Sequence, residues 1–226
     1  MNRGIYFISG IDTDAGKSFA TGYLAKTLNT QGIRTITQKF IQTGNIGRSE
    51  DIELHRKIMG TGLNEDDRSG LTMPEIFSYP ASPLLASKID KREINFKKIN
   101  DATAALAAKY DIVLVEGAGG LMVPLTSGML TIDYIEERGY PLIFVTSGKL
   151  GSVNHTLLSF EAIERRRIRL DAVMYNLYPE IKDTTIRDDT REYIRDYMAA
   201  HFPQTRFIEV PNIPSCPVFP SSPGKP

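Results

Sequence analysis

Residues 10–18 form a short segment whose residue types could bind phosphate: Gly-Ile-Asp-Thr-Asp-Ala-Gly-Lys-Ser. The apolar run Ile5–Ile8 predicts a strand before this segment, and apolar residues at helical spacing over Gly16–Leu28 predict a helix after it. Backbone N–H groups at a helix N-terminus attract an anion, Lys17 adds a positive charge, and the hydroxyl of Ser18 can reach a Mg²⁺ ion. The pattern therefore predicts a phosphate-binding loop and a protein that uses a nucleotide.

This loop departs from the common pattern G-x-x-x-x-G-K-[ST], because the first glycine would fall on Ile11 and instead stands at Gly10. A glycine-rich turn that merely links a strand to a helix is the alternative interpretation. Asp12 and Asp14 are also unusual here, since a carboxylate repels an anion unless a cation or an amine lies between them. We therefore expect a metal ion or an amine-bearing substrate on the other side of the loop.

Three further polar residues stand where predicted strands end, namely Lys39, Glu116 and Asn176. Glu116 follows four apolar strand residues and precedes a glycine run, so its carboxylate should be enclosed and should need a cation. A Mg²⁺ ion beside the nucleotide phosphates would supply that cation. Lys39, taken alone, could equally be a solvated lysine at a strand end.

Asp51 opens a predicted helix and admits two roles. It could cap the free amide groups of the helix, a common use of aspartate, or it could be a second carboxylate on the metal. Sequence spacing does not choose between these roles, and both can hold at once.

The elements that must position these residues are short apolar strands that alternate with helices. The strands are continuous and β-branched rather than alternating, which indicates that helices cover both faces of the sheet. We predict a doubly wound, mainly parallel α/β domain whose ligands gather at the carboxyl ends of its strands. The predicted strands are Ile5–Ile8, Arg34–Phe40, Ile112–Val115, Leu142–Thr146, Ala172–Tyr175 and Arg206–Val210, and the predicted helices are Gly16–Leu28, Asp51–Met59, Phe96–Lys109, Ile132–Arg138, Val153–Arg165 and Thr184–His201.

Composition narrows the classes of protein further. The 226 residues include 27 lysines and arginines against 27 aspartates and glutamates, so charge gives no reason to expect nucleic acid or an anionic membrane as a partner. The single cysteine, Cys216, fits a reducing cytoplasm, and we expect neither a signal peptide nor a membrane span of about 20 apolar residues. We expect one domain over residues 1–214 and a disordered, proline-rich tail over residues 215–226.

Some residues that invite a functional reading have simpler explanations. His155, near a helix start, is more often a packing or capping residue than a catalyst, and His55 is expected at the surface. The run Arg165–Arg167 is expected to be a solvated helix end that suits the helix dipole.

Four motifs in order make the chain resemble the dethiobiotin synthetase family, whose members close the ureido ring in biotin synthesis. The motifs are the loop Gly10–Ser18, the segment Lys39–Gly44, the run Val115–Gly120 (Val-Glu-Gly-Ala-Gly-Gly), and the segment Leu150–His155. The resemblance implies a P-loop NTPase-like fold. It also implies that ATP and Mg²⁺ support the conversion of 7,8-diaminopelargonic acid and CO₂ to dethiobiotin, through a carbamate and a carbamic-phosphoric anhydride, with release of ADP and phosphate.

The resemblance also implies roles for individual residues. Lys17 and Lys39 would be catalytic, and Ser18, Asp51 and Glu116 would bind Mg²⁺. The enzyme would be a homodimer, and the segment Ser147–Asn154 would offer N–H groups to the substrate carboxylate, in the family often from the partner subunit. The nucleotide site would comprise Asp14, Ala15, Gly16, Lys17, Ser18, Phe19, Asp51, Glu116, Gly117, Ala118, Gly119, Asn176, Leu177, Pro211, Asn212 and Ile213, and the substrate site Thr13, Lys39, Thr43, Leu150, Gly151, Ser152, Val153 and Asn154.

The chain departs from the family pattern at Phe40, where a proline is usual, at Leu84, where a histidine is frequent, and in its proline-rich C-terminus. The tail lacks the usual helix that helps to cover the base, so we expect the base to be held loosely. The rival class is a Min/Par-type regulatory ATPase, but Asp12 stands where those proteins have a lysine. A related ATP-dependent ligase acting on another substrate is the nearer alternative.

Overall fold

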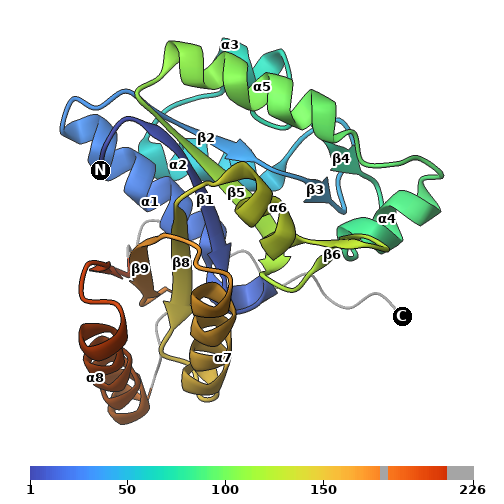
Figure 1. Ribbon diagram of the computed structural model, residues 1–226. Helices are drawn as coiled ribbons and strands as arrows, with labels where there is room; N and C mark the ends of the chain where they lie inside the picture. Colours follow the sequence, from blue (N-terminus) through green and yellow to red (C-terminus); the bar gives the residue numbers. More distant parts are fainter. Residues whose placement is uncertain (179–182, 213–226) are drawn as a thin grey trace.

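A single sheet of six parallel strands forms the centre of the computed structural model, which describes residues 1–178 and 183–212 (Figure 1). The strand β1 lies in the interior of the sheet, with β8 on one side and β5 on the other. The phosphate-binding loop therefore leaves the sheet where the order of strands changes direction, which is where doubly wound sheets bind ligands. The strands are β1 (Gly4–Gly10), β2 (Thr35–Lys39), β5 (Ile112–Gly120), β8 (Leu142–Ser147), β9 (Leu170–Asn176) and β10 (Arg206–Val210), in the order β10-β9-β8-β1-β5-β2.

Helices cover both faces of this sheet. Figure 1 shows α1 and α2 on one face and α5, α6 and α7 on the other, and α8 packs beside α7. The helices are α1 (Lys17–Thr30), α2 (Glu50–Met59), α5 (Phe96–Lys109), α6 (Thr131–Arg138), α7 (Ser152–Arg165) and α8 (Thr184–His201). The predicted fold, a mainly parallel α/β domain with helices on both faces, is confirmed.

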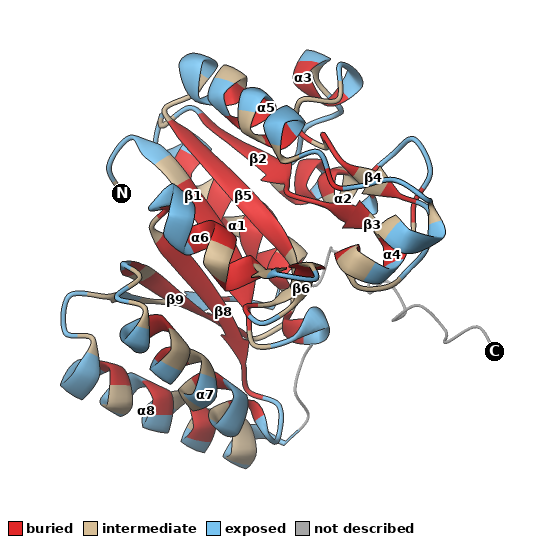
Figure 2. Ribbon diagram, turned by 45° about the vertical axis from the view of Figure 1, so that its right-hand side comes forward, coloured by how far each residue is buried: buried red, intermediate tan, exposed pale blue. Residues whose placement is uncertain are grey.

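The core consists of two apolar layers, because successive residues of a strand point to opposite faces. In β1, Tyr6 and Ile8 belong to the layer under α1, and Phe7 belongs to the layer under α5, α6 and α7. Figure 2 shows the strands as the most buried part of the molecule, with exposed residues on the outer sides of the helices. This burial on both faces explains why the strands read as continuous apolar runs.

Several short elements were not predicted from the sequence. They are too short to produce a recognisable period, although Ser82 and Pro83 form a typical start of α4. The additional elements are the 3₁₀ turn η1 (Thr13–Ala15), the helices α3 (Glu65–Arg68) and α4 (Pro83–Ile89), and the strands β3 (Gln42–Thr43), β4 (Ile76–Phe77), β6 (Pro124–Thr126) and β7 (Met129–Leu130).

Within the described residues, none of the helices is long and apolar enough to cross a membrane. The predicted tail over residues 215–226 lies outside the residues that the structure describes.

Candidate active site

The phosphate-binding loop leaves β1 and continues into α1 through the turn η1. Asp12 caps this turn, because its carboxylate accepts a hydrogen bond from the backbone N–H of Thr13 at 2.7 Å. Gly16 has φ = 79°, and a Cβ atom there would lie 1.9 Å from the side-chain nitrogen of Asn176. The second glycine of the loop is therefore required both by its left-handed backbone and by the close approach of Asn176.

Lys17 is buried and points back along the loop. Its Nζ donates hydrogen bonds to the carbonyl oxygens of Asp12 at 2.7 Å and Thr13 at 3.3 Å. Burial, and after it the nearby ammonium of Lys39, lower the pKa of Lys17 to about 8. A phosphate in the loop would favour the charged form of this lysine, which is the interaction that such a loop is built to make.

Three oxygen-bearing side chains from three elements meet at the start of α1. The Oγ of Ser18 lies 2.7 Å from Oδ1 of Asp51, on α2, and 2.7 Å from Oε1 of Glu116, on β5. A hydroxyl has one hydrogen, so it donates to one of these carboxylates at a time. The three residues predicted to bind the metal are thus brought together, although they stand far apart in the sequence.

Lys39 lies between the same two carboxylates. Its Nζ is 2.5 Å from Oδ2 of Asp51 and 2.9 Å from Oε1 of Glu116, and it also donates to the carbonyl of Gly117 at 3.3 Å. Burial alone would lower the pKa of Lys39, but the two carboxylates outweigh burial and raise it. Lys39 is therefore a buried, charged member of this cluster, and its alternative as a solvated strand-end lysine is wrong.

Glu116 is fully buried and remains ionised through its partners. Burial alone would raise the pKa of Glu116, but the charge of Lys39 and the hydrogen bonds from His55 and Lys39 hold it well below its ordinary value. The enclosure predicted for this carboxylate is confirmed.

Asp51 does not cap α2, so that part of its predicted alternatives is wrong. The helix begins at Glu50, and Oγ of Ser49 accepts the capping hydrogen bond from the backbone N–H of Ile52 at 3.2 Å. Asp51 lies in the first turn, where its carboxylate contacts Ser18 and Lys39 instead. Serine is as favourable a cap as aspartate, and this signal was available in the sequence.

The prediction that His55 lies at the surface is also wrong. His55 is fully buried on α2, with Nε2 at 2.8 Å from Oε2 of Glu116 and Nδ1 at 3.0 Å from Oγ1 of Thr37. The spacing from Asp51 is four residues, which places both side chains on one face of the helix. That spacing was the signal that could have identified it.

The oxygens of Ser18, Asp51 and Glu116 suit Mg²⁺. This hard cation binds oxygen and usually takes one or two carboxylates, with phosphate oxygens and water completing its shell. Among the described residues, no group of three or more His, Cys, Asp and Glu side chains is arranged to hold a metal.

Beyond Glu116, the glycine-rich run continues β5. A Cβ atom on Gly117 would lie 2.8 Å from the ring of Phe7, so a side chain there would disturb the core. Ala118 and Gly119 are half-buried, and Gly119 has φ = 64°. Phe40, which departs from the family pattern, is fully buried, with its ring 5.4 Å from that of Phe7.

The segment predicted to bind the substrate begins beside the phosphate-binding loop. Nζ of Lys149 donates to the carbonyl of Asp14 at 3.2 Å, which joins the connection between β8 and α7 to the loop. Sequence reasoning did not single out this lysine. Leu150 is 85% exposed, whereas Ser152 is buried with its Oγ 3.0 Å from that of Ser147.

The remaining substrate residues differ in position. Gly151 and Asn154 are exposed and Val153 is half-buried at the start of α7. Thr13 is exposed on the loop, and Thr43 is half-buried on β3, beyond the end of β2.

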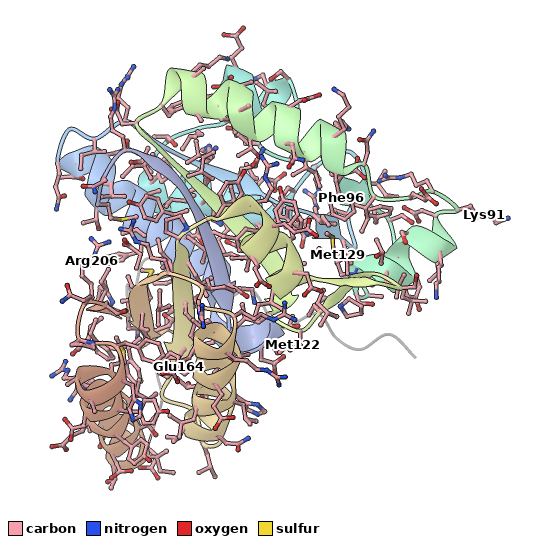
Figure 3. All side chains as sticks on the ribbon, viewed as in Figure 1. Lys91, Phe96, Met122, Met129, Glu164 and Arg206 are labelled. Atoms are coloured by element: carbon pink, nitrogen blue, oxygen red, sulfur yellow. The ribbon has the colours of Figure 1, made fainter. Side chains whose placement is uncertain are left out.

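A groove of about 500 Å³ lies beside the loop, between α7 and the residues that follow β5. Asp12 lines one part of it, and apolar side chains line much of the rest. These include Met122, which is labelled in Figure 3, and Leu158; both side chains are more than half exposed. His155 also lines the groove and is exposed. The groove thus combines a carboxylate with an apolar surface.

Asn176, predicted to contact the base, already has partners within the chain. Its side-chain nitrogen donates to the carbonyls of Ala15 at 3.1 Å and Tyr178 at 2.6 Å, and its oxygen accepts from the backbone N–H of Tyr178 at 3.1 Å. The ring of Tyr178 stacks on Phe19 with centroids 4.1 Å apart. A contact from Asn176 to the base stays a prediction.

The other residues predicted near the base follow β9 and β10. Leu177 is half-buried, and its backbone N–H donates to the carbonyl of Val210 at 3.0 Å. Pro211 and Asn212 are exposed, and Ile213 lies outside the described residues.

Comparison with known proteins shows which family the chain belongs to. A family model described as an AAA domain matches residues 5–217. The ATP-dependent dethiobiotin synthetase BioD 2 of Pasteurella multocida is 52% identical over 203 residues, which cover 90% of this chain and 95% of that protein. The protein of the same name from Haemophilus ducreyi is 50% identical over 204 residues, which cover 90% and 96%.

The solved structures include a putative plasmid partition protein from Borrelia burgdorferi bound to AMPPNP. It is similar in fold, with a TM-score of 0.53, 12% identity, and coverage of 94% of this chain and 89% of that one. An identity of 12% shows a similarity of fold only. Identities of 52% and 50% over 90% of the chain show that the proteins belong to one family. The chain therefore belongs to the ATP-dependent dethiobiotin synthetase family.

Proposed function

We propose that this protein uses ATP to carboxylate 7,8-diaminopelargonic acid with CO₂ and to close the product to dethiobiotin, releasing ADP and phosphate. The observation that carries the proposal is the cluster in which the buried Lys39 bridges Asp51 and Glu116 directly beside Ser18. This cluster adjoins the phosphate-binding loop and belongs to a chain of the dethiobiotin synthetase family.

The nucleotide would be held mainly through its phosphates. The loop N–H groups and Lys17 would bind the β- and γ-phosphates, and Ser18, Asp51 and Glu116 would bind Mg²⁺. Mg²⁺ would supply charge neutralisation of the transferring phosphoryl group. Positioning and electrostatics, rather than a nucleophilic side chain, are what such a transfer needs from a protein.

Two charges on the chain suit the carbamate chemistry. In the reaction, one amine of the substrate takes up CO₂, the carbamate oxygen attacks the γ-phosphorus, and the second amine displaces phosphate as the ring closes. An anionic nucleophile must therefore approach an anionic phosphate, and Lys17 and Lys39 would offset that repulsion. Both ammonium groups lie at the carboxyl edge of the sheet, where the reacting groups would meet.

The groove beside the loop would hold the diamine. Asp12 lines it and can attract an ammonium group, and Met122 and Leu158 offer an apolar surface to an aliphatic chain. We propose that Thr13, Lys39, Thr43 and residues 150–154 complete the substrate site, with N–H groups at the start of α7 meeting the substrate carboxylate.

We also propose that the enzyme works as a homodimer in the cytoplasm, without nucleic acid or membrane as a partner. The exposed Leu150, in the segment that the family resemblance assigns to the partner's substrate, supports the dimer.

A single assay tests the proposed function. Purified protein is incubated with ATP, Mg²⁺, diaminopelargonic acid and bicarbonate, each component is omitted in turn, and ADP and dethiobiotin are quantified by mass spectrometry. We expect one ADP per dethiobiotin, and little ADP without the diamine. Equal ATP turnover without the diamine, or stimulation by DNA or lipid, would instead support a regulatory ATPase, whereas turnover with a different diamine or carboxylate would support a related ligase.

A further inference from the structure

Glu116 also contacts a buried set of polar side chains to which the proposed reaction assigns no role. His55 is fully buried, with Nε2 at 2.8 Å from Oε2 of Glu116 and Nδ1 at 3.0 Å from Oγ1 of Thr37. Arg56 donates through Nη1 to the same hydroxyl at 2.8 Å and is held in turn by Asp67 at 2.8 and 2.9 Å. Thr37 lies on β2, His55 and Arg56 on α2, and Asp67 on α3. Their hydrogen bonds lead to the carboxylate of Glu116.

The directions of these hydrogen bonds can be assigned. Glu116 accepts from Lys39 through Oε1, so its carboxylate also accepts, through Oε2, the hydrogen on Nε2 of His55. Thr37 accepts from Arg56. In the neutral imidazole that carries its hydrogen on Nε2, Nδ1 is an acceptor, so the hydroxyl of Thr37 donates to it. Donation then runs from Arg56 through Thr37 and His55 to Glu116.

This arrangement orients the carboxylate. Oε1 of Glu116 faces Ser18 and Lys39, and Oε2 faces His55 on the opposite side. A carboxylate held through one oxygen only can rotate, whereas one held through both presents a fixed oxygen to a cation. His55, Thr37 and Arg56 thus orient the carboxylate of Glu116, as outer-shell hydrogen-bond partners orient the ligands of other metal sites.

We propose that His55, fixed by Thr37 and Arg56, is a positioning residue that aims Oε1 of Glu116 at the Mg²⁺ held with Ser18 and Asp51. The inference rests on the proposed role of Glu116 as a Mg²⁺ ligand. It assigns a function to a histidine that the sequence alone placed at the surface.

Two substitutions separate positioning from packing. His55→Leu fills the site with an apolar side chain and removes the donor, whereas His55→Gln keeps an N–H that can reach Oε2 of Glu116. His201→Leu, at the exposed end of α8, is the matched control for loss of a histidine. Mn²⁺ binding to each protein with ADP is measured from the electron paramagnetic resonance signal of free Mn²⁺, and the melting temperature and the Mg²⁺ dependence of kcat are measured on the same samples.

We expect His55→Leu to weaken Mn²⁺ binding about tenfold or more, in the range found for lost outer-shell partners. His55→Gln should restore Mn²⁺ binding to within about threefold of the unmodified protein, and His201→Leu should leave it unchanged. Equal losses of melting temperature in both His55 variants, with unchanged Mn²⁺ binding, would overturn the proposal. So would failure of His55→Gln to restore binding lost in His55→Leu.

A further variant covers the case in which His55→Leu does not fold. Thr37→Val keeps His55 and removes the hydroxyl that fixes its ring, so it should weaken Mn²⁺ binding in the same direction by a smaller factor; unchanged binding would refute the relay. Glu116→Gln tests the premise separately, because unchanged Mn²⁺ binding in that variant would remove Glu116 from the metal site. The Mn²⁺ measurement uses no diamine, so it decides the inference even if the protein forms no dethiobiotin.

Discussion

Replacing ATP by GTP or CTP should change kcat/KM for dethiobiotin formation by no more than about tenfold. The reason lies in Asn176, whose side-chain nitrogen already donates to Ala15 and Tyr178 and whose oxygen already accepts from Tyr178. One lone pair of that oxygen remains for a base. A neutral hydrogen bond contributes about 0.5–1.5 kcal/mol, and about 1.4 kcal/mol corresponds to a factor of ten.

The assay compares kcat/KM for the three nucleotides in the unmodified protein and in Asn176→Ala, at saturating Mg²⁺, diamine and bicarbonate. In the variant the carbonyl of Ala15 loses its partner, so the loop should loosen and all three nucleotides should lose kcat/KM by one common factor. Asn2→Ala, an exposed asparagine just before β1, is the matched control and should change none of the values.

A different result would refute this reasoning. An ATP preference of a thousandfold or more corresponds to about 4 kcal/mol, which is more than one neutral hydrogen bond supplies. If Asn176→Ala removed that preference selectively, its bonds to the loop would have to exchange for adenine when the nucleotide binds.

Three further predictions follow from the charged clusters. Lys17→Ala should weaken ADP binding, measured by calorimetry, and also lower kcat, whereas Lys39→Ala should lower kcat by about 100-fold or more with a smaller effect on ADP binding; near-normal kcat would remove Lys39 from catalysis. Glu116→Gln and Asp51→Asn should each raise the Mg²⁺ concentration for half activity while circular dichroism stays unchanged, and an unchanged Mg²⁺ dependence would exclude that residue as a ligand. Burial alone would raise the pKa of Asp67, but its buried arginine partner lowers it, so the stabilisation is present above the unfolded pKa and is lost as pH falls through the folded one. Asp67→Asn should therefore destabilise the fold by about 3 kcal/mol or more at pH 7 in urea unfolding, with a difference that narrows below about pH 4; a difference independent of pH would contradict this.

The phosphate-binding loop and the burial of Glu116 could be predicted from the local sequence, because in both cases a few neighbouring residues determine the structure. A glycine before Lys17 must adopt a left-handed conformation at the helix start, and a carboxylate after four apolar strand residues must be enclosed. The same reasoning failed for His55, which was judged as an isolated residue type. Its two ring nitrogens are held by Glu116 on β5 and Thr37 on β2, which are far from it in the sequence.

The cap of α2 shows how a neighbouring residue can take a role that the sequence also allows for Asp51. The sequence predicts Asp51 as a cap or a metal ligand, but Ser49 caps α2 and the carboxylate of Asp51 is available to the site. The Oγ of Ser49 donates in turn to Gln42 at 2.6 Å, which ties the start of α2 to β3. The sequence offers both Ser49 and Asp51 as caps, and the tertiary contacts of Asp51 with Ser18 and Lys39 distinguish their roles.

The strand order is the part of the site that the sequence could not supply. Lys39 ends β2 and Glu116 lies on β5, with 76 residues between them in the chain, and the rule that ligands gather at strand ends places both on one edge without making them neighbours. They meet because β5 inserts between β1 and β2, so that Lys39 and Glu116 are paired in register. Had β2 paired directly with β1, Glu116 would lie one strand away and its buried charge would lack its ammonium partner. The buried charge of Glu116 needs a cationic partner, and this order of strands is what places the ammonium group of Lys39 beside it.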